Sequence, residues 1–266
     1  MINSLLSDTA LHQKYQFWFY AYPTGNPILI NAHRLRQTLL QTKAGLDPEG
    51  DDVCFNRMVL IGHSMGGVLS QLMVQSSPDG LWDLATRSKR TIDELDISEE
   101  YKTYFHQLLE FQPLPFVTRV VFMATPHRGS DTADTFIGRL GVSLVSLPMH
   151  TVNMFKTTLK ALGNENIRKA DFKLTSILSL SPQNPIMTKM AETPVADTVK
   201  VNSIIGNNKE AGVPGGTDGI VSYSSAHWEN AESELIIHND HDVHTNPYGI
   251  REVHRILMEH LEENIH

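Results

Sequence analysis

The sequence predicts an α/β fold in which helices flank a mostly parallel β-sheet. Short apolar runs of the kind found in buried strands alternate with helical patterns along the chain. One such run, Arg57–Ile61, leads straight into a glycine-rich turn and then a helical pattern. The chain has 266 residues, of which 41% are hydrophobic and 20% charged. That is enough to bury one large core, so we expect a single domain over residues 1–266.

The predicted strands are rich in aromatic or β-branched residues and lack the polar alternation of a half-exposed sheet. They are Tyr15–Tyr22, Arg57–Ile61, Arg119–Ala124, Val199–Ile205 and the shorter Glu234–His238. Apolar residues at helical spacing predict helices over Ala32–Thr42, Gly67–Ser76, Ser98–Glu110 and Ile250–Glu263.

The region from about 130 to 194 departs from this alternation. It is rich in Leu, Met, Phe and Thr and shows no clear strand. We interpret it as a helical cap inserted over a site, and a plain layer of packing helices is the alternative. The apolar composition of such a cap favours acyl chains over charged substrates.

Ser64 lies between a predicted strand and a predicted helix, in the segment Gly62–Gly66 with sequence GHSMG. In that setting, G-x-S-x-G spacing indicates the nucleophile of an α/β-hydrolase fold. The serine must stand on a tight turn, where side chains at Gly62 and Gly66 would collide. The Met65 N–H, at the positive end of the helix, is the expected first donor to an oxyanion. The alternative is a glycine-rich turn with a bystander serine.

A nucleophilic serine needs a general base, usually a histidine oriented by a carboxylate, and in this fold the acid precedes the histidine. Asp218 follows a late strand and lies between glycines that would turn its carboxylate inward, although it could merely tighten the loop. His241 and His244 both follow the last predicted strand. We favour His241, which comes first. Asp240 and Asp242 are alternative acids, but sequence neighbours rarely reach the far ring nitrogen of the same histidine.

A metal site is a further interpretation of the loop after the last strand. Its candidate ligands are His238, Asp240, His241, Asp242 and His244. Because this segment is a loop and not a helix that displays two histidines on one face, we predict no metal and no cofactor.

Charge and composition limit the partners. The net charge is −8 with a pI near 5.9, and there is no basic run, which argues against nucleic acid or an anionic membrane surface. No transmembrane segment is expected, because no stretch approaches about 18 consecutive apolar residues. Met1–His12 does not resemble a signal peptide, so the default expectation is cytoplasmic. Cys54, the single cysteine, precedes an apolar run and is expected to be a buried, inert thiol.

Several stretches resemble the lipase-like α/β-hydrolases, with similarity to the inositol-deacylase and lecithin–cholesterol acyltransferase branch. They cover nearly the whole chain and are Tyr15–Tyr20, Tyr22–Gly25, Gly62–Gly67, Val121–Ser130, Thr217–Val221 and His241 with Asn246–Pro247 and Arg251–Val253. The run ATPHRGS over Ala124–Ser130 is the most specific to lipase-like members. The resemblance implies Ser64 as nucleophile, Asp218 as acid and His241 as base. His127, in that run, is either a site-wall or cap-anchoring residue or a buried structural histidine.

One departure from the family concerns the N-terminus. Members of this fold usually begin with strands that end in a His-Gly loop, which provides the second oxyanion N–H. No His-Gly pair occurs in Met1–Lys14. The chain therefore looks N-terminally short, and the Tyr22–Gly25 loop is the nearest substitute for that donor. An exposed sheet edge would follow, which predicts a homodimer.

These features favour a carboxylic ester hydrolase, of esterase or lipase type, that acts on a small-molecule ester or lipid through an acyl-enzyme. A truncated or degenerate hydrolase fold that serves as a binding or assembly module is the alternative from another class. An acyltransferase would use the same three residues with an alcohol in place of water.

Overall fold

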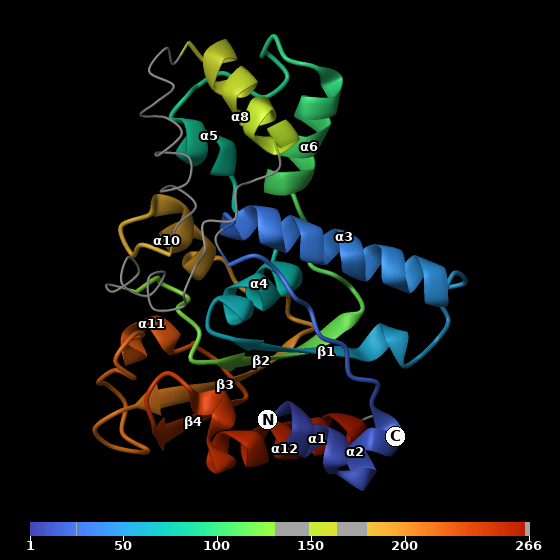
Figure 1. The fold of residues 1–266 in the computed structure, drawn as a ribbon, viewed down its shortest axis with the longest axis vertical. Coiled ribbons are helices and arrows are strands. Elements are labelled where there is room, and N and C mark those ends of the chain that lie inside the picture. The colour runs from blue at the N-terminus through green and yellow to red at the C-terminus, as the bar shows by residue number, and fades with distance from the viewer. Residues whose placement is uncertain (25, 131–148, 164–179, 264–266) are drawn as a thin grey trace.

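A computed structural model describes residues 1–24, 26–130, 149–163 and 180–263. Its centre is a four-stranded sheet in the order β1-β2-β3-β4 (Figure 1). The strands are β1 (Met58–His63), β2 (Val117–Met123), β3 (Lys200–Asn207) and β4 (Ser233–His238). Every neighbouring pair is parallel, so all four carboxyl ends lie at one edge of the sheet. The predicted α/β fold with a parallel sheet is confirmed.

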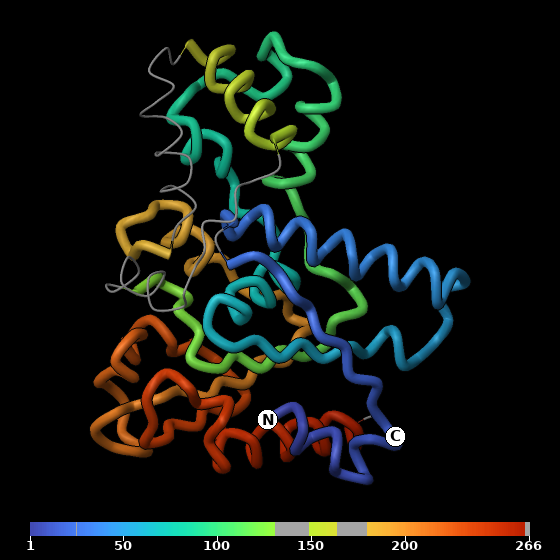
Figure 2. Tube along the Cα trace, in the orientation of Figure 1, coloured from blue at the N-terminus to red at the C-terminus, as the bar shows by residue number. Residues whose placement is uncertain are grey.

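Helices cover both faces of the sheet (Figures 1 and 2). On one side lie α3 (Ile28–Leu46) and α4 (Met65–Val74), and on the other α1 (Ile2–Ser7), α2 (Thr9–Lys14) and α12 (Pro247–Glu262). Three more gather beyond α3, away from the sheet: α5 (Leu81–Thr86), α6 (Glu99–Leu109) and α8 (Met149–Ala161). The remaining elements are α10 (Pro185–Glu192), α11 (Tyr223–Ala226) and the short 3-10 helices η1 (Phe55–Arg57) and η2 (Val243–Thr245).

The side chains of β2 show how the core holds these layers together. Val120 and Phe122 pack in the cluster beneath α3 and α4, whereas Val121 and Met123 pack in the cluster beneath α12. This two-residue alternation is that of a strand covered on both faces. Burying each such side chain contributes about 1.5–3 kcal/mol, which fixes the register of β2 in the middle of the sheet.

The predicted strand Tyr15–Tyr22 is wrong. This segment is extended but does not belong to the sheet. Its aromatic side chains pack on one another and on neighbouring elements instead: the Tyr20 and Tyr22 rings stack, the Tyr15 hydroxyl donates to the Leu257 carbonyl oxygen (2.8 Å), and the Trp18 ring centroid lies 5.7 Å from that of Phe55. Aromatic composition indicates a surface that packs well, but a strand also needs a partner edge, which local composition does not specify.

Two further expectations about the region of β1 are corrected. Residues Met58–Ile61 pack alternately against the core clusters on the two faces of the sheet, but they are half-buried and not buried, because β1 is an edge strand among the described residues. Cys54 is exposed and not buried, since it lies in the loop before η1. The homodimer through a sheet edge stays a prediction.

The predicted cap falls partly outside the described residues. Within residues 130–194, the described portion contains α8 and α10. The Phe155 ring of α8 packs against Phe105 of α6, with ring centroids 5.5 Å apart. Both the cap and the single-domain organisation stay predictions. In the part of the chain that the structure describes, no helix is long and apolar enough to cross a membrane.

Candidate active site

Ser64 alone joins β1 to α4, because the strand runs on to His63 and the helix begins at Met65. Its backbone has φ 55° and ψ −127°, a conformation that costs a non-glycine residue on the order of 1–3 kcal/mol. The turn is held by the Ser64 N–H, which donates to the Met123 carbonyl oxygen (2.8 Å). The buried Ser64 Oγ has no hydrogen-bond partner among the described residues. A strained turn thus holds an uncommitted hydroxyl at the sheet edge.

Two glycines allow this turn to close. A Cβ on Gly62 would lie 2.5 Å from the Gly66 carbonyl oxygen, and one on Gly67 would lie 1.8 Å from Thr125 Oγ1. Gly67 therefore lets α4 pack against the loop that follows β2. Gly66 is different, because a Cβ there would meet only the Tyr22 hydroxyl, at an ordinary contact distance of 3.5 Å. The expectation that Gly66 avoids a collision is wrong.

Asp218 and His241 meet although they lie in different loops, after β3 and β4. His241 Nδ1 donates to Asp218 Oδ2 over 2.8 Å, and both residues are buried. The other carboxylate oxygen, Oδ1, accepts the N–H groups of Ile220 (2.8 Å) and Val221 (2.7 Å). With a proton on Nδ1, a neutral imidazole has its lone pair on Nε2, which is the form that a general base needs.

Gly206 makes this meeting possible, and the sequence analysis missed it. It is the penultimate residue of β3, and a Cβ there would lie 2.9 Å from the Asp218 Cβ and 2.8 Å from the Asp240 carbonyl oxygen. The loops that carry Asp218 and His241 could not approach so closely over any larger residue. The strand expected over Val199–Ile205 stops one residue short of Gly206, whereas in the structure Gly206 lies within β3, where a glycine marks close approach of another backbone.

His63 ties the His241 loop to the end of β1. Its Nε2 donates to the His241 carbonyl oxygen (2.9 Å). Burial lowers the pKa of His63 to about 4, so the ring is neutral at pH 7. His244 packs on this ring, with centroids 4.2 Å apart. The structure therefore brings His241, and not His244, to Asp218. Asp240, one of the alternative acids, is exposed, and its carboxylate accepts the N–H of Asp242 (3.3 Å).

Two hydrogen-bond donors lie at the start of α4, beside the Ser64 turn. Met65 is the first residue of α4, so its N–H is at the positive end of a ten-residue helix. The Tyr22 hydroxyl lies beside Gly66 in the same first turn. Burial raises the pKa of Tyr22 to about 12, which keeps the hydroxyl protonated and able to donate. Gly25, at the other end of the predicted donor loop, lies outside the described residues.

His127 is fully buried and serves the packing around the site. Its Nδ1 donates to Gln71 Oε1 in α4 (2.8 Å), and its ring stands against those of Phe122 and Trp228. Gln71 Nε2 in turn donates to the carbonyl oxygen of Met190 in α10 (3.2 Å). Burial lowers the pKa of His127 to about 3, so it is neutral. Of the two interpretations, this position fits a buried histidine that anchors α4 to its surroundings.

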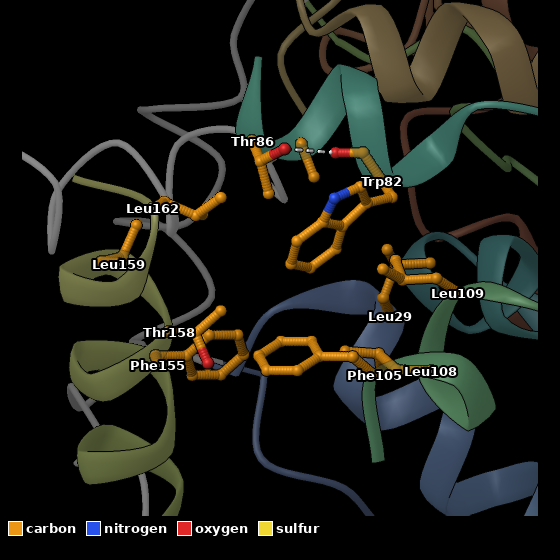
Figure 3. A pocket seen from close by; sticks show the side chains of 11 residues that line it. Leu29, Trp82, Thr86, Phe105, Leu108, Leu109, Phe155, Thr158, Leu159 and Leu162 are labelled. Atoms are coloured by element: carbon orange, nitrogen blue, oxygen red, sulfur yellow. Dashed lines mark hydrogen bonds between the residues drawn. The ribbon is translucent and has the colours of Figure 1, made fainter. Parts of the chain in front are cut away.

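An apolar pocket of about 30 Å³ lies away from these residues (Figure 3). It is enclosed by side chains of α3, α5, α6 and α8, among them Leu29, Trp82, Phe105 and Phe155. Neither Ser64 nor Asp218 nor His241 contributes to its wall. The pocket is therefore a gap between packed helices and not part of the candidate site.

No protein-family model matches the chain, and no curated protein matches it in sequence. Several solved structures match it, and two of them match over most of its length. The lipase BlEst2 of Bacillus licheniformis in its mature form is 16% identical with a TM-score of 0.42, over 90% of this chain and 79% of that one. A lipase-esterase related protein from Clostridium acetobutylicum is 13% identical with a TM-score of 0.36, over 91% and 79%. Such weak matches carry no argument about chemistry, and they do not show the inositol-deacylase or acyltransferase branch. The parallel sheet and the strand–Ser64–helix turn themselves give the chain an α/β-hydrolase type of fold.

Proposed function

We propose that this protein hydrolyses carboxylic esters, with Ser64 as nucleophile, His241 as general base and Asp218 as the acid that orients it. The observation that carries the proposal is the buried pair of Asp218 and His241, joined over 2.8 Å. It comes from loops at the same sheet edge as the strained Ser64 turn. Three side chains with these roles, delivered in this chain order, are what acyl transfer through a serine requires.

The chemistry follows from the proton positions. His241 Nε2 removes the proton from Ser64 Oγ as the oxygen attacks the ester carbonyl carbon, and then gives that proton to the leaving alcohol. A water molecule, deprotonated by the same nitrogen, then attacks the acyl carbon. The bond from that carbon to Ser64 Oγ breaks, His241 Nε2 returns the proton to Oγ, and the carboxylic acid is released. Asp218 keeps the Nδ1 proton in place and stabilises the imidazolium that forms in each half-reaction.

The charge on the carbonyl oxygen also needs stabilisation. The Met65 N–H is the first proposed donor, supported by its place at the start of α4. The Tyr22 hydroxyl is the second, supported by its position beside Gly66 and by the raised pKa that keeps it protonated. In this proposal, Tyr22 takes the part that a backbone N–H of a His-Gly loop plays in related folds.

The test is hydrolysis of p-nitrophenyl esters of several acyl lengths by the wild type, Ser64→Ala and Ser70→Ala. Ser70 is the matched control, since it is equally buried in α4 but its hydroxyl donates to the Gly66 carbonyl oxygen. We expect Ser64→Ala to lose activity by about 10⁶-fold and Ser70→Ala to keep most of it. Full activity in Ser64→Ala, or none in the wild type, contradicts the proposal.

A second pair of variants assigns the base. His241→Ala should lose activity nearly as completely as Ser64→Ala, because residues that act as a unit fail together. His244→Ala, three residues further along, should retain turnover within about tenfold, since no proton passes through it. The reverse result would reassign the base to His244.

A further inference from the structure

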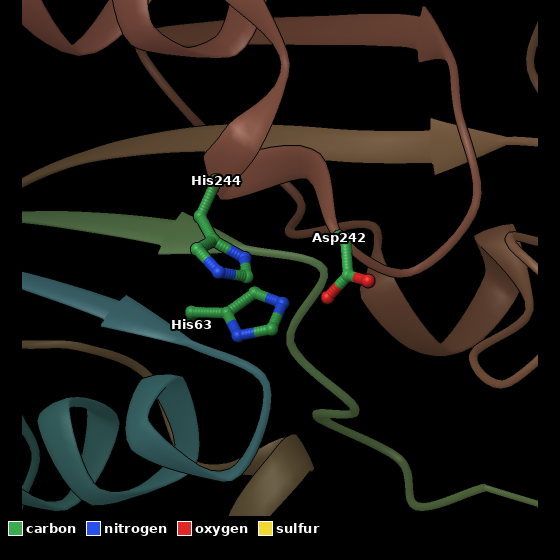
Figure 4. Close-up of side chains that lie close together, drawn as sticks. All are labelled: His63, Asp242 and His244. Atoms are coloured by element: carbon green, nitrogen blue, oxygen red, sulfur yellow. The ribbon is translucent and has the colours of Figure 1, made fainter.

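His63, Asp242 and His244 form a second cluster beside the proposed catalytic residues (Figure 4). His63 is the last residue of β1, Asp242 precedes η2 and His244 lies within it. One potential ligand atom from each residue lies within 4.8 Å of the other two. Figure 4 shows a ring nitrogen of each histidine on the side that faces the Asp242 carboxylate. The geometry points to a binding site for a divalent transition-metal ion of the zinc class.

The donor set has the composition that such ions take. Two imidazoles and one carboxylate bind Zn²⁺ in sites that keep a fourth position open for water. Ligand atoms at about 2.0–2.1 Å from a tetrahedral ion lie roughly 3.3 Å apart, so atoms that now lie within 4.8 Å of one another need to close by at most about 1.5 Å. Asp242 is exposed, which lets an ion reach the cluster from solvent and leaves the carboxylate free to make that movement.

Two of the three members of the cluster have uncommitted atoms among the described residues, whereas His63 Nε2 already donates to the His241 carbonyl oxygen, so an ion would replace that bond or bind His63 through Nδ1. The Nδ1 atom of His244 is buried and has no hydrogen-bond partner in the described residues, a condition that calls for an explanation. No Lys or Arg of the described chain forms a salt bridge with Asp242. Burial lowers the pKa of His63 and that of His244, so both rings are neutral, as a metal ligand must be.

A second group of possible metal ligands differs from the His63 cluster because its carboxylates are already paired with cations. The carboxylates of Glu232, Glu259 and Glu263 also gather within 4.8 Å of one another. Each of them is already paired with a cation, namely Arg119, Lys200 or Arg255. These side chains supply the positive charge that an ion would bring, so this group carries no metal proposal.

An ion at the His63 cluster would cross-link the end of β1 to the loop that carries His241. The hydrogen bond from His63 Nε2 to the His241 carbonyl oxygen joins the same two segments. A ligand that binds only the folded chain stabilises it, so occupancy should raise the unfolding temperature. This inference does not rest on ester hydrolysis, because ion binding and thermal unfolding are both measured without substrate.

The experiment is calorimetric titration of chelator-treated, dialysed protein with Zn²⁺, together with the visible absorption spectrum after addition of Co²⁺. We expect one ion per chain, an intense tetrahedral Co²⁺ band and an unfolding temperature that rises with Zn²⁺. Asp242→Asn and His244→Ala should each weaken Zn²⁺ binding at least about tenfold, since even outer-shell partners of a metal are worth that much. Asp242 is exposed and its side chain caps no helix, so Asp242→Asn should fold normally.

His238→Ala is the matched control. His238 is an exposed histidine four residues before Asp242, and its ring is hydrogen-bonded to the Asn208 carbonyl oxygen (3.2 Å), outside the cluster. It should bind Zn²⁺ as the wild type does. If His238→Ala weakens binding as much as His244→Ala, or if Asp242→Asn binds with wild-type affinity, the ion is held adventitiously by some of the 13 histidines and the proposal fails. Absence of binding in the wild type overturns it equally.

Discussion

The carboxyl ends and the amino ends of the four strands differ in backbone strain and in how fully their buried polar groups are hydrogen-bonded. At the carboxyl ends, Ser64 follows β1 and Ala124 follows β2, and both residues have positive φ. The buried Ser64 Oγ has no hydrogen-bond partner among the described residues. Towards the amino ends, the fully buried Arg119 of β2 is hydrogen-bonded through all three of its side-chain nitrogens. Its guanidinium donates to Asn202 Oδ1 (2.7 Å), to Glu263 Oε1 (2.7 Å) and to Glu232.

This difference separates reactivity from stability. Backbone strain and uncommitted polar atoms persist only where the surrounding structure holds them, and they gather at sites that do chemistry. A buried charge that is paired and hydrogen-bonded serves stability, and removing one of its partners is costly. Substitutions at the carboxyl ends should therefore lower activity with little loss of stability, and substitutions at the amino ends should do the reverse.

Among the substitutions that test this difference between the two ends of the sheet, Asp218→Asn should have the largest effect, a loss of activity. The amide keeps one oxygen for the Ile220 and Val221 N–H groups but no longer holds the His241 tautomer. We expect kcat on p-nitrophenyl esters to fall on the order of 10⁴-fold, with little change in the urea midpoint. Asp242→Asn, assayed without added metal, is the control. Wild-type kcat in Asp218→Asn would show that another acid orients the base.

Arg119→Met tests the contribution of the amino ends of the strands to stability. It leaves Glu232 and Glu263 without their buried partner, although both are partly exposed and Lys200 remains beside them. We therefore expect a loss of about 3 kcal/mol in the free energy of unfolding by urea, at the low end for a broken buried pair. Activity per folded molecule should be unchanged. If Arg119→Met is as stable as the wild type, the amino ends of the strands do not contribute to stability in the way proposed.

Tyr22→Phe sharpens the account of the site. Loss of the hydroxyl removes the second proposed oxyanion donor, which typically lowers kcat by about 10²-fold, whereas KM and the unfolding temperature should change little. Tyr20→Phe is a suitable control, because the Tyr20 ring stacks on Tyr22 but its hydroxyl donates to the Asn31 carbonyl oxygen. Equal kcat in the two variants would place the second donor elsewhere.

The smallest expected effect is on the pH dependence of stability. Burial pushes the pKa values of Glu232 and Glu263 upward, but hydrogen bonds from Lys200 and Arg119 outweigh it, and both pKa values lie below the ordinary value of 4.5. Their contribution to stability is therefore complete above about pH 4.5 and is lost as the pH falls through the lowered values of the folded state. Between about pH 5 and pH 3, the urea midpoint should fall more steeply for the wild type than for the double variant Glu232→Gln/Glu263→Gln.

The sequence predicted the parts of the fold that depend on local pattern. The strand before Ser64, the helix after it and the loops of Asp218 and His241 all follow from periodicity and turn residues within a few positions. Tyr15–Tyr22 has the composition of a strand but no place in the sheet, because pairing depends on a partner far along the chain. For the same reason, Arg119 looked like an ordinary strand residue.

The metal cluster shows the same limit at the site. The histidines and aspartates of the loop after β4 invite a metal by sequence, yet only Asp242 and His244 from that loop join the cluster, and the third member comes from β1. His63 lies about 180 residues earlier, and only the parallel order of the sheet brings it there. Gly206 likewise gains its meaning from two loops that meet over it.

The central claim is that Ser64 is a nucleophile activated by His241. Its most direct test is reaction with a fluorophosphonate, followed by intact mass and peptide mapping. The account predicts a single adduct on the peptide that contains Ser64, no adduct in Ser64→Ala and a greatly slowed reaction in His241→Ala, with His244→Ala close to the wild type. Equal labelling of Ser64→Ala, or an adduct on any other residue, would contradict it.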